Sequence, residues 1–475
     1  GSGRATAVAI QADQKIVVAG SSRSVNGNIA VARLNSDGSP DNTFGTGGTV
    51  VEDLGGQENI EDMLLQPDGK ILLAGGAFNS AAFQRDALLV RYNSDGSRDA
   101  GFGTNGLVKT PGEAQGVALQ ADNKIVVGGT SLEDGVLLIM RHNSDGSLDT
   151  TFDADGDNDG IVELNLGIET FAYLEDIAVQ PDQKIVALGS TEVVNGAVIN
   201  LFRFNTDGSV DAAFDEGVDV NERVDFTIPN SNAYGTSLTI RGNGKSVIVG
   251  ISESQGFPRV EGVFVAQFNT NGTLDTGFDT DGVVELDLTA GERDNLRHVI
   301  IDMSDRVVAA GSAGNVDYEN DLAVVRLTST GAPDTSFSGD GIALAAINGP
   351  YASEFSRVVV QSNCKILAAG WASTENSRSI SLIQYNSDGS LDTTFGNTGV
   401  VLHDISMNSS LVHGLAVQPD GKILVADAFR TLNDGSEAAL VRFDADGSLD
   451  SSFGTDGTSL TDINVGGGDV WYDLL

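Results

Sequence analysis

A ten-residue motif recurs along the chain. The stretch NSDGSLDTTF occupies residues 143–152 and returns unchanged at 386–395, and near-copies begin at residues 35, 93, 205, 269, 328 and 444. In all eight copies a Gly is followed three positions later by Asp, and Phe follows three positions after that. The eight Phe residues, from Phe44 to Phe453, span 409 positions in seven intervals, a mean of about 58 residues. Repetition at a fixed period constrains the fold more strongly than length or composition does.

A second element precedes each motif. The segment LLQPDGKILLAGG at 64–76 has a counterpart in every repeat, and in seven of the eight its basic residue is followed five positions later by Gly. Short aliphatic runs on either side of Pro-Asp-Gly or Asn-Gly are typical of β-hairpins. A third run, such as ALLVRY at 87–92, leads into the motif, and a fourth, such as VVELDL at 283–288, follows it. Each repeat therefore predicts four short strands.

Four antiparallel strands in each of eight repeats indicate a β-propeller. We predict an all-β, eight-bladed propeller with four-stranded antiparallel blades, formed as a single domain by residues 1–475. Seven blades plus one extra repeat are the alternative. A linear β-solenoid usually has shorter repeats and parallel coils, which disagree with the hairpins. Because the chain starts inside a first strand and repeat eight ends with its own fourth strand, we expect no exchange of an outer strand between the first and last blades. The end, VWYDLL at 470–475, either docks beside blade 1 or begins a ninth first strand.

The two elements together resemble the delta-60 repeat family. The resemblance lies in the pairing of a QPDGKILLAG-type hairpin with NSDGSLDTTFG and extends over essentially the whole chain. It implies a β-propeller, and an extracellular or cell-surface location in a large bacterial surface or secreted protein. It implies no catalytic residues.

Charge and composition narrow the possible partners. The chain has 27 Lys and Arg against 67 Asp and Glu, a net charge of −40. Such a field repels polyanions, so nucleic acid is not an expected partner. No apolar run reaches the length of a membrane span, so we expect no membrane insertion. The single cysteine, Cys364, excludes an internal disulfide. We expect a monomeric module within a larger chain.

Strand direction predicts which side of the blades binds a ligand. Alternating strands place the recurring turns on one face and the connections that vary between repeats on the other. We interpret the motif Asp as a turn cap, the Phe as a plug between blades and the Arg before the motif as a structural donor. A specific ligand, carbohydrate or protein/peptide, is expected on the variable face. Aromatic residues of the variable loops are the candidate ligand-binding residues: Trp371, Tyr318, Tyr351, Phe257, Tyr173 and Phe171.

One acidic loop predicts a calcium site. In DADGDNDGIVE, at 153–163, acidic residues alternate, as oxygen ligands for Ca²⁺ require. The candidate ligands are Asp153, Asp155, Asp157, Asp159 and Glu163. The bidentate Glu of an EF-hand loop is missing, and a solvated acidic loop is the alternative interpretation. Weaker acidic patterns occur at 279–282 and 444–450.

The sequence favours a binding protein over an enzyme. It has no nucleophile elbow, phosphate-binding loop or dinucleotide fingerprint, and its four histidines lie in different repeats without mutual spacing. We therefore predict a non-catalytic extracellular ligand-binding or adhesion module. The alternatives are a polysaccharide-acting enzyme, a lyase or glycosidase that uses the central channel, and a structural spacer domain. The fold alone does not decide between them.

Overall fold

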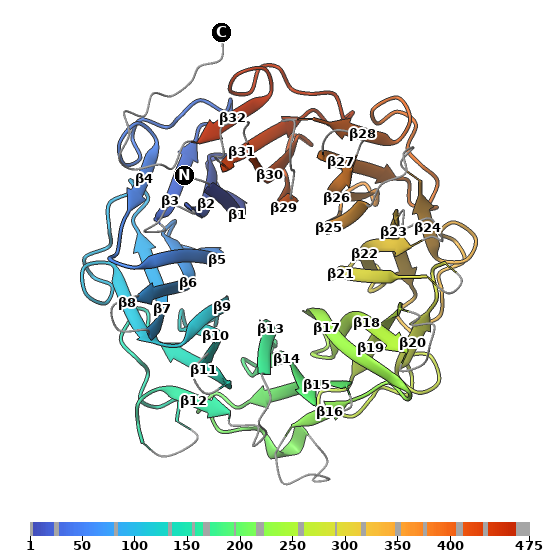
Figure 1. The fold of residues 1–475 in the computed structure, drawn as a ribbon, viewed down its shortest axis with the longest axis horizontal. Helices are drawn as coiled ribbons and strands as arrows, with labels where there is room; N and C mark the ends of the chain where they lie inside the picture. The colour runs from blue at the N-terminus through green and yellow to red at the C-terminus, as the bar shows by residue number, and fades with distance from the viewer. Residues whose placement is uncertain are drawn as a thin grey trace. The chain divides into compact units, whose positions relative to one another are not determined.

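Each repeat folds into one four-stranded antiparallel sheet, or blade (Figure 1). The structure is a computed structural model that describes residues 3–22, 28–79, 84–131, 135–153, 157–164, 172–193, 196–214, 223–254, 261–289, 292–314, 320–346, 353–373, 378–404, 412–430 and 436–461. Helix is limited, in these ranges, to one short 3-10 turn, Ala212–Phe214. The prediction of eight four-stranded antiparallel blades is confirmed, and the alternative of seven blades plus an extra repeat is wrong.

The chain divides into two compact units, and the first contains both ends of the described chain. It comprises Gly1–Ala114, Val359–Ser387 and Leu391–Leu475. Its strands belong to blades 1, 2, 7 and 8 and are β1 (Gly3–Ile10), β2 (Ile16–Ser22), β3 (Ile29–Leu34), β4 (Thr49–Glu52), β5 (Gln57–Leu65), β6 (Ile71–Asn79), β7 (Gln84–Tyr92), β8 (Leu107–Pro111), β26 (Ile366–Ser373), β27 (Arg378–Tyr385), β28 (Val400–His403), β29 (Val412–Val417), β30 (Ile423–Arg430), β31 (Ser436–Phe443) and β32 (Thr458–Thr461).

The second unit comprises Gln115–Val358 and Asp388–Ser390. It holds blades 3 to 6 and the first strand of blade 7. These strands are β9 (Glu113–Leu119), β10 (Ile125–Ser131), β11 (Val136–His142), β12 (Ile161–Leu164), β13 (Ala172–Val179), β14 (Ile185–Val193), β15 (Gly196–Phe204), β16 (Val224–Phe226), β17 (Ser231–Ile240), β18 (Ser246–Ser254), β19 (Glu261–Phe268), β20 (Val283–Leu286), β21 (Asp294–Ile301), β22 (Val307–Gly314), β23 (Asn320–Leu327), β24 (Ile342–Ala345) and β25 (Ser353–Val360). The expectation of a single domain stays a prediction.

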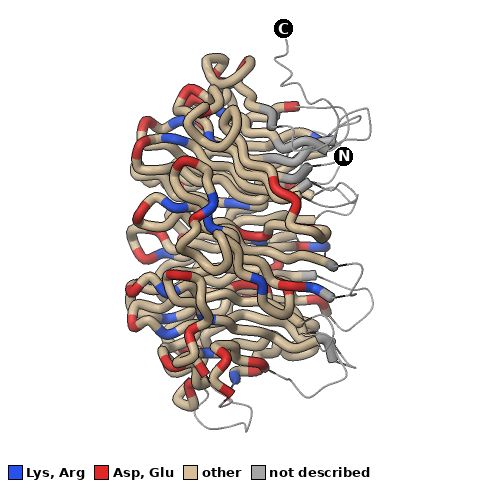
Figure 2. Tube along the Cα trace, turned by 90° about the vertical axis from the view of Figure 1, so that its left-hand side faces the viewer, with Lys and Arg blue, Asp and Glu red and all other residues tan. Residues whose placement is uncertain are grey.

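Within a blade the strands follow one another in sequence order, and the pairing of successive strands is antiparallel. The turns after the first and third strands therefore share one edge of the blade, which we name the turn edge. The connections after the second and fourth strands share the other, which we name the loop edge. Many of the charged residues in Figure 2 lie in the turns of the turn edges.

A β-bulge interrupts the first strand of several blades. In β13 the register shifts between Leu174 and Asp176, so that Glu175 is the extra residue. In β21 the shift leaves Arg297 extra, and in β29 it leaves His413 extra. A bulge bends the strand and re-aims the side chain of the extra residue. These residues therefore depart from the alternation that the sequence pattern indicates.

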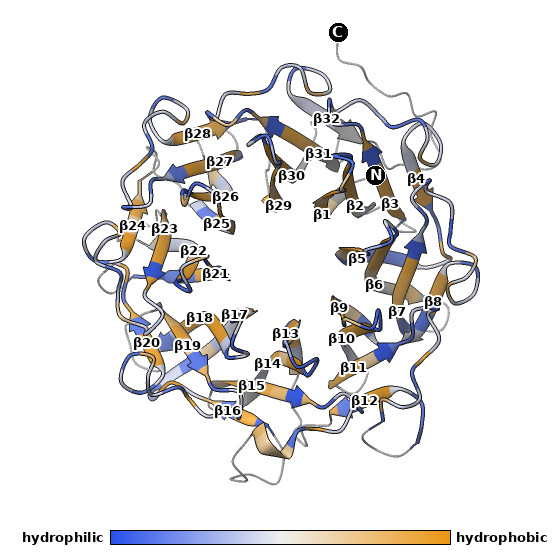
Figure 3. Cartoon of the chain, turned by 180° about the vertical axis from the view of Figure 1, so that it is seen from behind, coloured by the Kyte–Doolittle hydropathy of each residue, from blue (hydrophilic) through white to orange (hydrophobic). Residues whose placement is uncertain are grey.

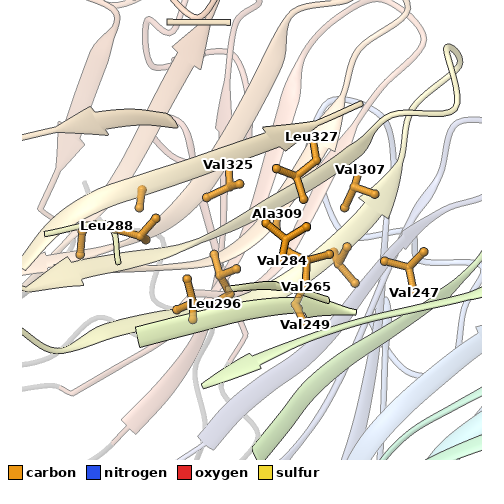
Figure 4. Packing of buried hydrophobic residues seen from close by; sticks show 14 of the residues in the cluster. Val247, Val249, Val265, Val284, Leu288, Leu296, Val307, Ala309, Val325 and Leu327 are labelled. Carbon is orange, nitrogen blue, oxygen red and sulfur yellow. The ribbon is translucent and has the colours of Figure 1, made fainter. Parts of the chain in front are cut away.

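The second and third strands form the core of each blade. Every side chain of β11 is buried, and apolar strands alternate with hydrophilic turns in Figure 3. Apolar side chains of neighbouring blades pack against one another. Figure 4 shows this packing in the second unit, where Val249 and Val265 of blade 5 share a cluster with Leu296 and Val307 of blade 6. Burial of these faces between blades is the main stabilising contribution to the fold.

The motif Phe closes the contact between successive blades. All eight are fully buried, which confirms their predicted place as plugs. The Gly of the neighbouring motif makes room for the ring. Gly38 has a φ of +85°, and a Cβ there would lie 2.5 Å from Cδ2 of Phe453. Only glycine fits this close approach at positive φ.

Blades 1 and 8 meet without exchanging a strand. Blade 1 is β1 to β4 and blade 8 is β29 to β32, each in sequence order. Arg442 donates a hydrogen bond to the Ser36 carbonyl, and the amide of Gly454 donates to the Asp37 carbonyl at 3.1 Å. The prediction that no outer strand is exchanged is confirmed. The predicted docking segment 470–475 lies outside the described residues.

Candidate functional site

The turn edge carries a repeated network of charged side chains. In six blades the Arg at the end of the third strand donates its Nε to the motif Asp at 2.6–2.8 Å. The basic residue of the first hairpin reaches the same Asp in all eight blades, at 2.5–3.4 Å. The other carboxylate oxygen caps the turn: Oδ1 of Asp41 accepts from the amide of Thr43 at 3.0 Å and from its hydroxyl at 2.7 Å. The predicted capping role of the motif Asp is confirmed.

This network determines the ionisation of the motif Asp. Burial by itself would raise the pKa of Asp149, but hydrogen bonds from Lys124 and Thr151 and the charge of Arg141 hold that pKa well below its usual range. Asp41 and Asp450 show the same balance of causes, and their pKa values are lowered as strongly. The carboxylates stay charged and paired, which suits a structural role and not proton transfer.

In three blades, those of Arg33, Arg141 and Arg442, the Arg of the network also donates to a backbone carbonyl of the neighbouring blade. Its guanidinium lies over the motif Phe in six blades, at 4.2–4.9 Å from the ring centroid. Arg33 donates to the Ser94 carbonyl of blade 2, and Arg141 donates to the Thr206 carbonyl of blade 4. The recurring Arg, Lys and motif Asp of the turn edge are therefore explained by their structural contacts.

Blade 5 reaches the same arrangement with two residues exchanged. In blade 3 the hairpin position holds Gln120, which donates to the Gln183 carbonyl of blade 4 at 2.7 Å, and the strand position holds Arg141. In blade 5 the hairpin position holds Arg241, which donates to the Asp305 carbonyl, and the strand position holds Gln267. In blade 5 the guanidinium therefore comes from the hairpin position instead of the third strand, and it still donates to a carbonyl of the next blade.

The weaker acidic pattern at 444–450 surrounds a protein cation. Nζ of Lys422 lies 2.7 Å from Oδ1 of Asp444 and 2.6 Å from Oδ2 of Asp450. An ammonium group therefore occupies the place between these carboxylates.

The predicted calcium loop at 153–163 is described only in part. Asp155 lies outside the described residues, whereas Asp153, Asp157, Asp159 and Glu163 lie within them. Oδ1 of Asp157 accepts from the amide of Asp159 at 3.0 Å, and Oδ1 of Asp159 accepts from the amide of Ile161 at 2.7 Å. Both carboxylates therefore cap turns with one oxygen. Calcium binding at this loop stays a prediction.

Two of the six predicted ligand-binding aromatics are among the described residues, and both lie at loop edges. Tyr173, near the start of β13, is 41% exposed, and Trp371, near the end of β26, is partly exposed. The structure places these two residues in different units. The other four, Phe171, Phe257, Tyr318 and Tyr351, lie outside the described residues.

Trp371 has a cationic neighbour that the sequence did not indicate. The guanidinium carbon of Arg378, at the start of β27, lies 4.2 Å from the centroid of the Trp371 ring. The strand register explains the contact, since Trp371 pairs with Ile380 and Ser373 pairs with Arg378. One face of the indole is therefore covered by a cation and is not a bare stacking platform.

A polar group on the first strands of the second unit was also missed. Arg297 of β21 donates its Nε to Oε1 of Glu354 in β25, and Nδ2 of Asn295 lies 3.3 Å from the same oxygen. The side chain of Arg297 is 48% exposed. The first strands of the blades lie innermost in this unit (Figure 1). We name Asn295, Arg297, Glu354 and Glu175 the inner-strand group.

The pKa of Glu175 is raised although its side chain reaches solvent. The surrounding protein removes water from it and raises its pKa to about 7; the charge of Arg297 opposes this shift and that of Asp176 adds to it. A signal for this group was present in the sequence. The residue nine positions before the hairpin cation is not constant in type among the repeats: Thr6, Glu61, Gln115, Glu175, Thr236, Arg297, Ser356 and His413.

Metal and membrane sites are not evident in the described parts of the chain. Within the described ranges, no group of three or more His, Cys, Asp or Glu is placed to hold a metal ion. His142 is fully buried, and burial lowers its pKa to about 4. Over the same ranges, no helix combines the length and apolar character that a membrane span requires.

Repeated blades with an architectural turn edge and a variable loop edge define the chain as a repeat β-propeller. The chain belongs to the family described as a domain of unknown function (DUF5122) β-propeller, whose profile matches one segment in each repeat. The matched residues are 11–44, 66–102, 120–152, 180–214, 242–278, 304–337, 361–395 and 418–453. The comparison with curated proteins found no match to the sequence.

Several solved structures resemble the fold at low identity. The β-propeller domain of the trilobed protease from Pyrococcus furiosus, described as having an open velcro topology, is 10% identical with a TM-score of 0.42, over 82% of this chain and 95% of that one. The acylaminoacyl peptidase of Pyrococcus horikoshii is 12% identical with a TM-score of 0.40, over 82% and 52%. A polysaccharide lyase, an ulvan lyase, is 12% identical with a TM-score of 0.47, over 83% and 93%. None of these likenesses bears on activity.

Proposed function

We propose that the protein is a non-catalytic ligand-binding module that acts outside a bacterial cell, with its ligand at the loop edges of the blades. The observation that carries the proposal is the contrast between the two edges. On the turn edge the recurring Arg, Lys and Asp are paired with one another and with the next blade. On the loop edge Tyr173 remains 41% exposed and Trp371 remains partly exposed. Exposed aromatic side chains among polar ones are typical of binding surfaces.

The extracellular setting is supported by the repeat resemblance and by charge. The hairpin and motif resemble the delta-60 repeats of bacterial surface and secreted proteins. A net charge of −40 favours solubility and is compatible with a saline exterior. The partner class that we propose is carbohydrate, or a protein or peptide on a cell or matrix surface.

A binding screen with edge-specific variants tests the proposal. The protein is applied to glycan and peptide arrays, and hits are measured by calorimetry. Trp371→Ala or Tyr173→Ala should weaken binding while the melting temperature stays near that of the parent. Asp392→Ala, on a turn edge, should lower the melting temperature and leave affinity intact, because Lys365 pairs with this Asp at 2.5 Å. A ligand whose affinity responds only to Asp392→Ala, or no ligand on either array, would contradict the proposal.

A polysaccharide-acting enzyme is the second candidate, and the inner-strand group favours it. A carboxyl with a pKa of about 7 is suited to general acid–base catalysis near neutral pH, and an adjacent Arg can stabilise negative charge. Incubation with polysaccharides, followed by detection of new reducing ends or unsaturated products, separates the candidates. Turnover that Glu175→Gln abolishes would favour the enzyme, whereas saturable binding without product favours the module.

We also propose calcium as a cofactor of the loop at 153–163. Ca²⁺ bound to the folded protein would raise its stability. Unfolding temperatures measured with calcium and with a chelator test this, and Asp157→Asn with Asp159→Asn should remove the difference. Equal unfolding temperatures of the parent protein in both buffers would refute the calcium site.

A further inference from the structure

Arg378 differs from the other cations of the structure in its partners. Among the described residues it has no hydrogen bond and no ion pair, and its contact is with the ring of Trp371 at 4.2 Å. By contrast, Arg98 pairs with Glu52 at 2.8 Å, and Arg85 pairs with Glu113 at 2.8 Å. The chain has 67 acidic residues and only 27 basic ones. A guanidinium without a carboxylate partner is unexpected in so acidic a chain, and no carboxylate or carbonyl oxygen of the described residues accepts from the N–H donors of Arg378.

The contact with Trp371 prepares this guanidinium for a ligand. Trp371 is held in β26, between two other strands of its blade, and so provides a fixed surface. A cation over an indole ring is stabilised by the ring quadrupole, and part of the entropy cost of ordering the side chain is met before a ligand arrives. A guanidinium carries five donors in one plane and binds a carboxylate through two parallel hydrogen bonds. The pair thus presents a positioned anion-binding group beside an apolar ring.

We propose that Trp371 and Arg378 form a subsite for the carboxylate of an acidic sugar residue. The inference rests on the proposed binding function and names the chemistry of one of its subsites. The sugar carboxylate binds the donors of Arg378, and apolar C–H groups of the pyranose ring contact the accessible part of the indole. The glycan as a whole is sparsely charged, because a protein with a net charge of −40 repels a dense polyanion.

The surrounding sheet favours a sugar over an extended peptide. β26 lies between β25 and β27, and β27 lies between β26 and β28. β26 therefore offers no free edge, and the pairing of β28 with residues 380–383 leaves only Arg378 and Ser379 at the start of β27 without a strand on that side, too short an edge for a peptide strand to add to. Recognition at this place depends on side chains, as is usual for sugars.

The test compares two probes that differ in one functional group. The probes are a disaccharide that ends in glucuronate and the same disaccharide ending in glucose, and binding is measured by calorimetry on the whole chain. The parent should bind the glucuronate probe about tenfold or more tightly than the glucose probe, as expected for a charged bidentate contact. Arg378→Gln should remove the preference, and Arg378→Lys should keep part of it. Trp371→Leu should reduce the preference because the guanidinium loses its support.

Controls separate this inference from the general binding function. Arg98→Gln removes one positive charge from a turn edge and should leave the preference unchanged. Equal affinities of the parent for both probes, or tighter glucose binding by Arg378→Gln, would overturn the subsite while the binding module stands. Binding of an acidic peptide through Arg378, without binding of the glucuronate probe, would also overturn it. Absence of any ligand at either edge would overturn the binding module itself.

Discussion

The exchange of Arg and Gln in blade 5 allows a quantitative test of the turn-edge network. In blade 3, Arg141 is 2% exposed, donates to Asp149 at 2.7 Å, donates to the Thr206 carbonyl and lies over Phe152 at 4.6 Å. Arg141→Gln keeps an amide donor for Asp149, as Gln267 provides for Asp275 in blade 5. The variant loses a hydrogen bond from a charged donor, about 1.5–3 kcal/mol, and a cation–π contact, about 0.5–2 kcal/mol. We expect a loss of about 2–5 kcal/mol in the free energy of unfolding.

A second substitution should recover much of this loss. Gln120→Arg places a guanidinium where blade 5 has Arg241, within reach of the carbonyl that Gln120 contacts now. Alone, Gln120→Arg should destabilise the protein, because it adds a cation beside Arg141. Together the two substitutions reproduce the blade 5 arrangement, so their effects should be non-additive by about 2 kcal/mol or more in the favourable direction.

Urea unfolding followed by circular dichroism measures the four members of this cycle. The reciprocal cycle in blade 5, with Arg241→Gln and Gln267→Arg, is the matched control and should show coupling of the same sign. Additive effects in both cycles would refute the reasoning, because the two positions would then not share one network.

Three further predictions follow from the blades. Ser246 is fully buried where other repeats have Ile or Val, and its Oγ has no hydrogen-bond partner among the described residues. Ser246→Val should therefore raise the free energy of unfolding by about 1–2 kcal/mol, and a lower urea midpoint for this variant would contradict the prediction; Ile185→Ser is the destabilising control. The pKa values of the motif Asp residues are lowered in the folded state, so these residues stabilise the fold above their unfolded pKa, and this stabilisation is lost as pH falls through about 4 and below. A melting temperature that stays constant down to pH ~3 would contradict this prediction. A circular permutant with its new ends between Phe226 and Ser231 and the original ends joined should fold with a melting temperature near that of the parent, because every blade then keeps its own four strands; loss of cooperative unfolding would show that strand order matters.

The sequence by itself determined the number of blades, the four strands in each, and the capping and plugging roles of the motif residues. These features depend on contacts between residues close in sequence or on a pattern repeated eight times. The Asp41 cap, for example, reaches only to Thr43, two residues away.

Only the tertiary structure decided which side chains meet across strands and blades. Asn295 and Glu354 are 59 positions apart, and Trp371 meets Arg378 because of the register of β26 and β27. The bulge that re-aims Glu175 and Arg297 breaks the strand alternation on which sequence interpretation relies. Architectural residues could thus be predicted because every repeat needs them for the same packing. Candidate binding residues occur once each, and their roles depend on neighbours that folding brings from distant parts of the chain.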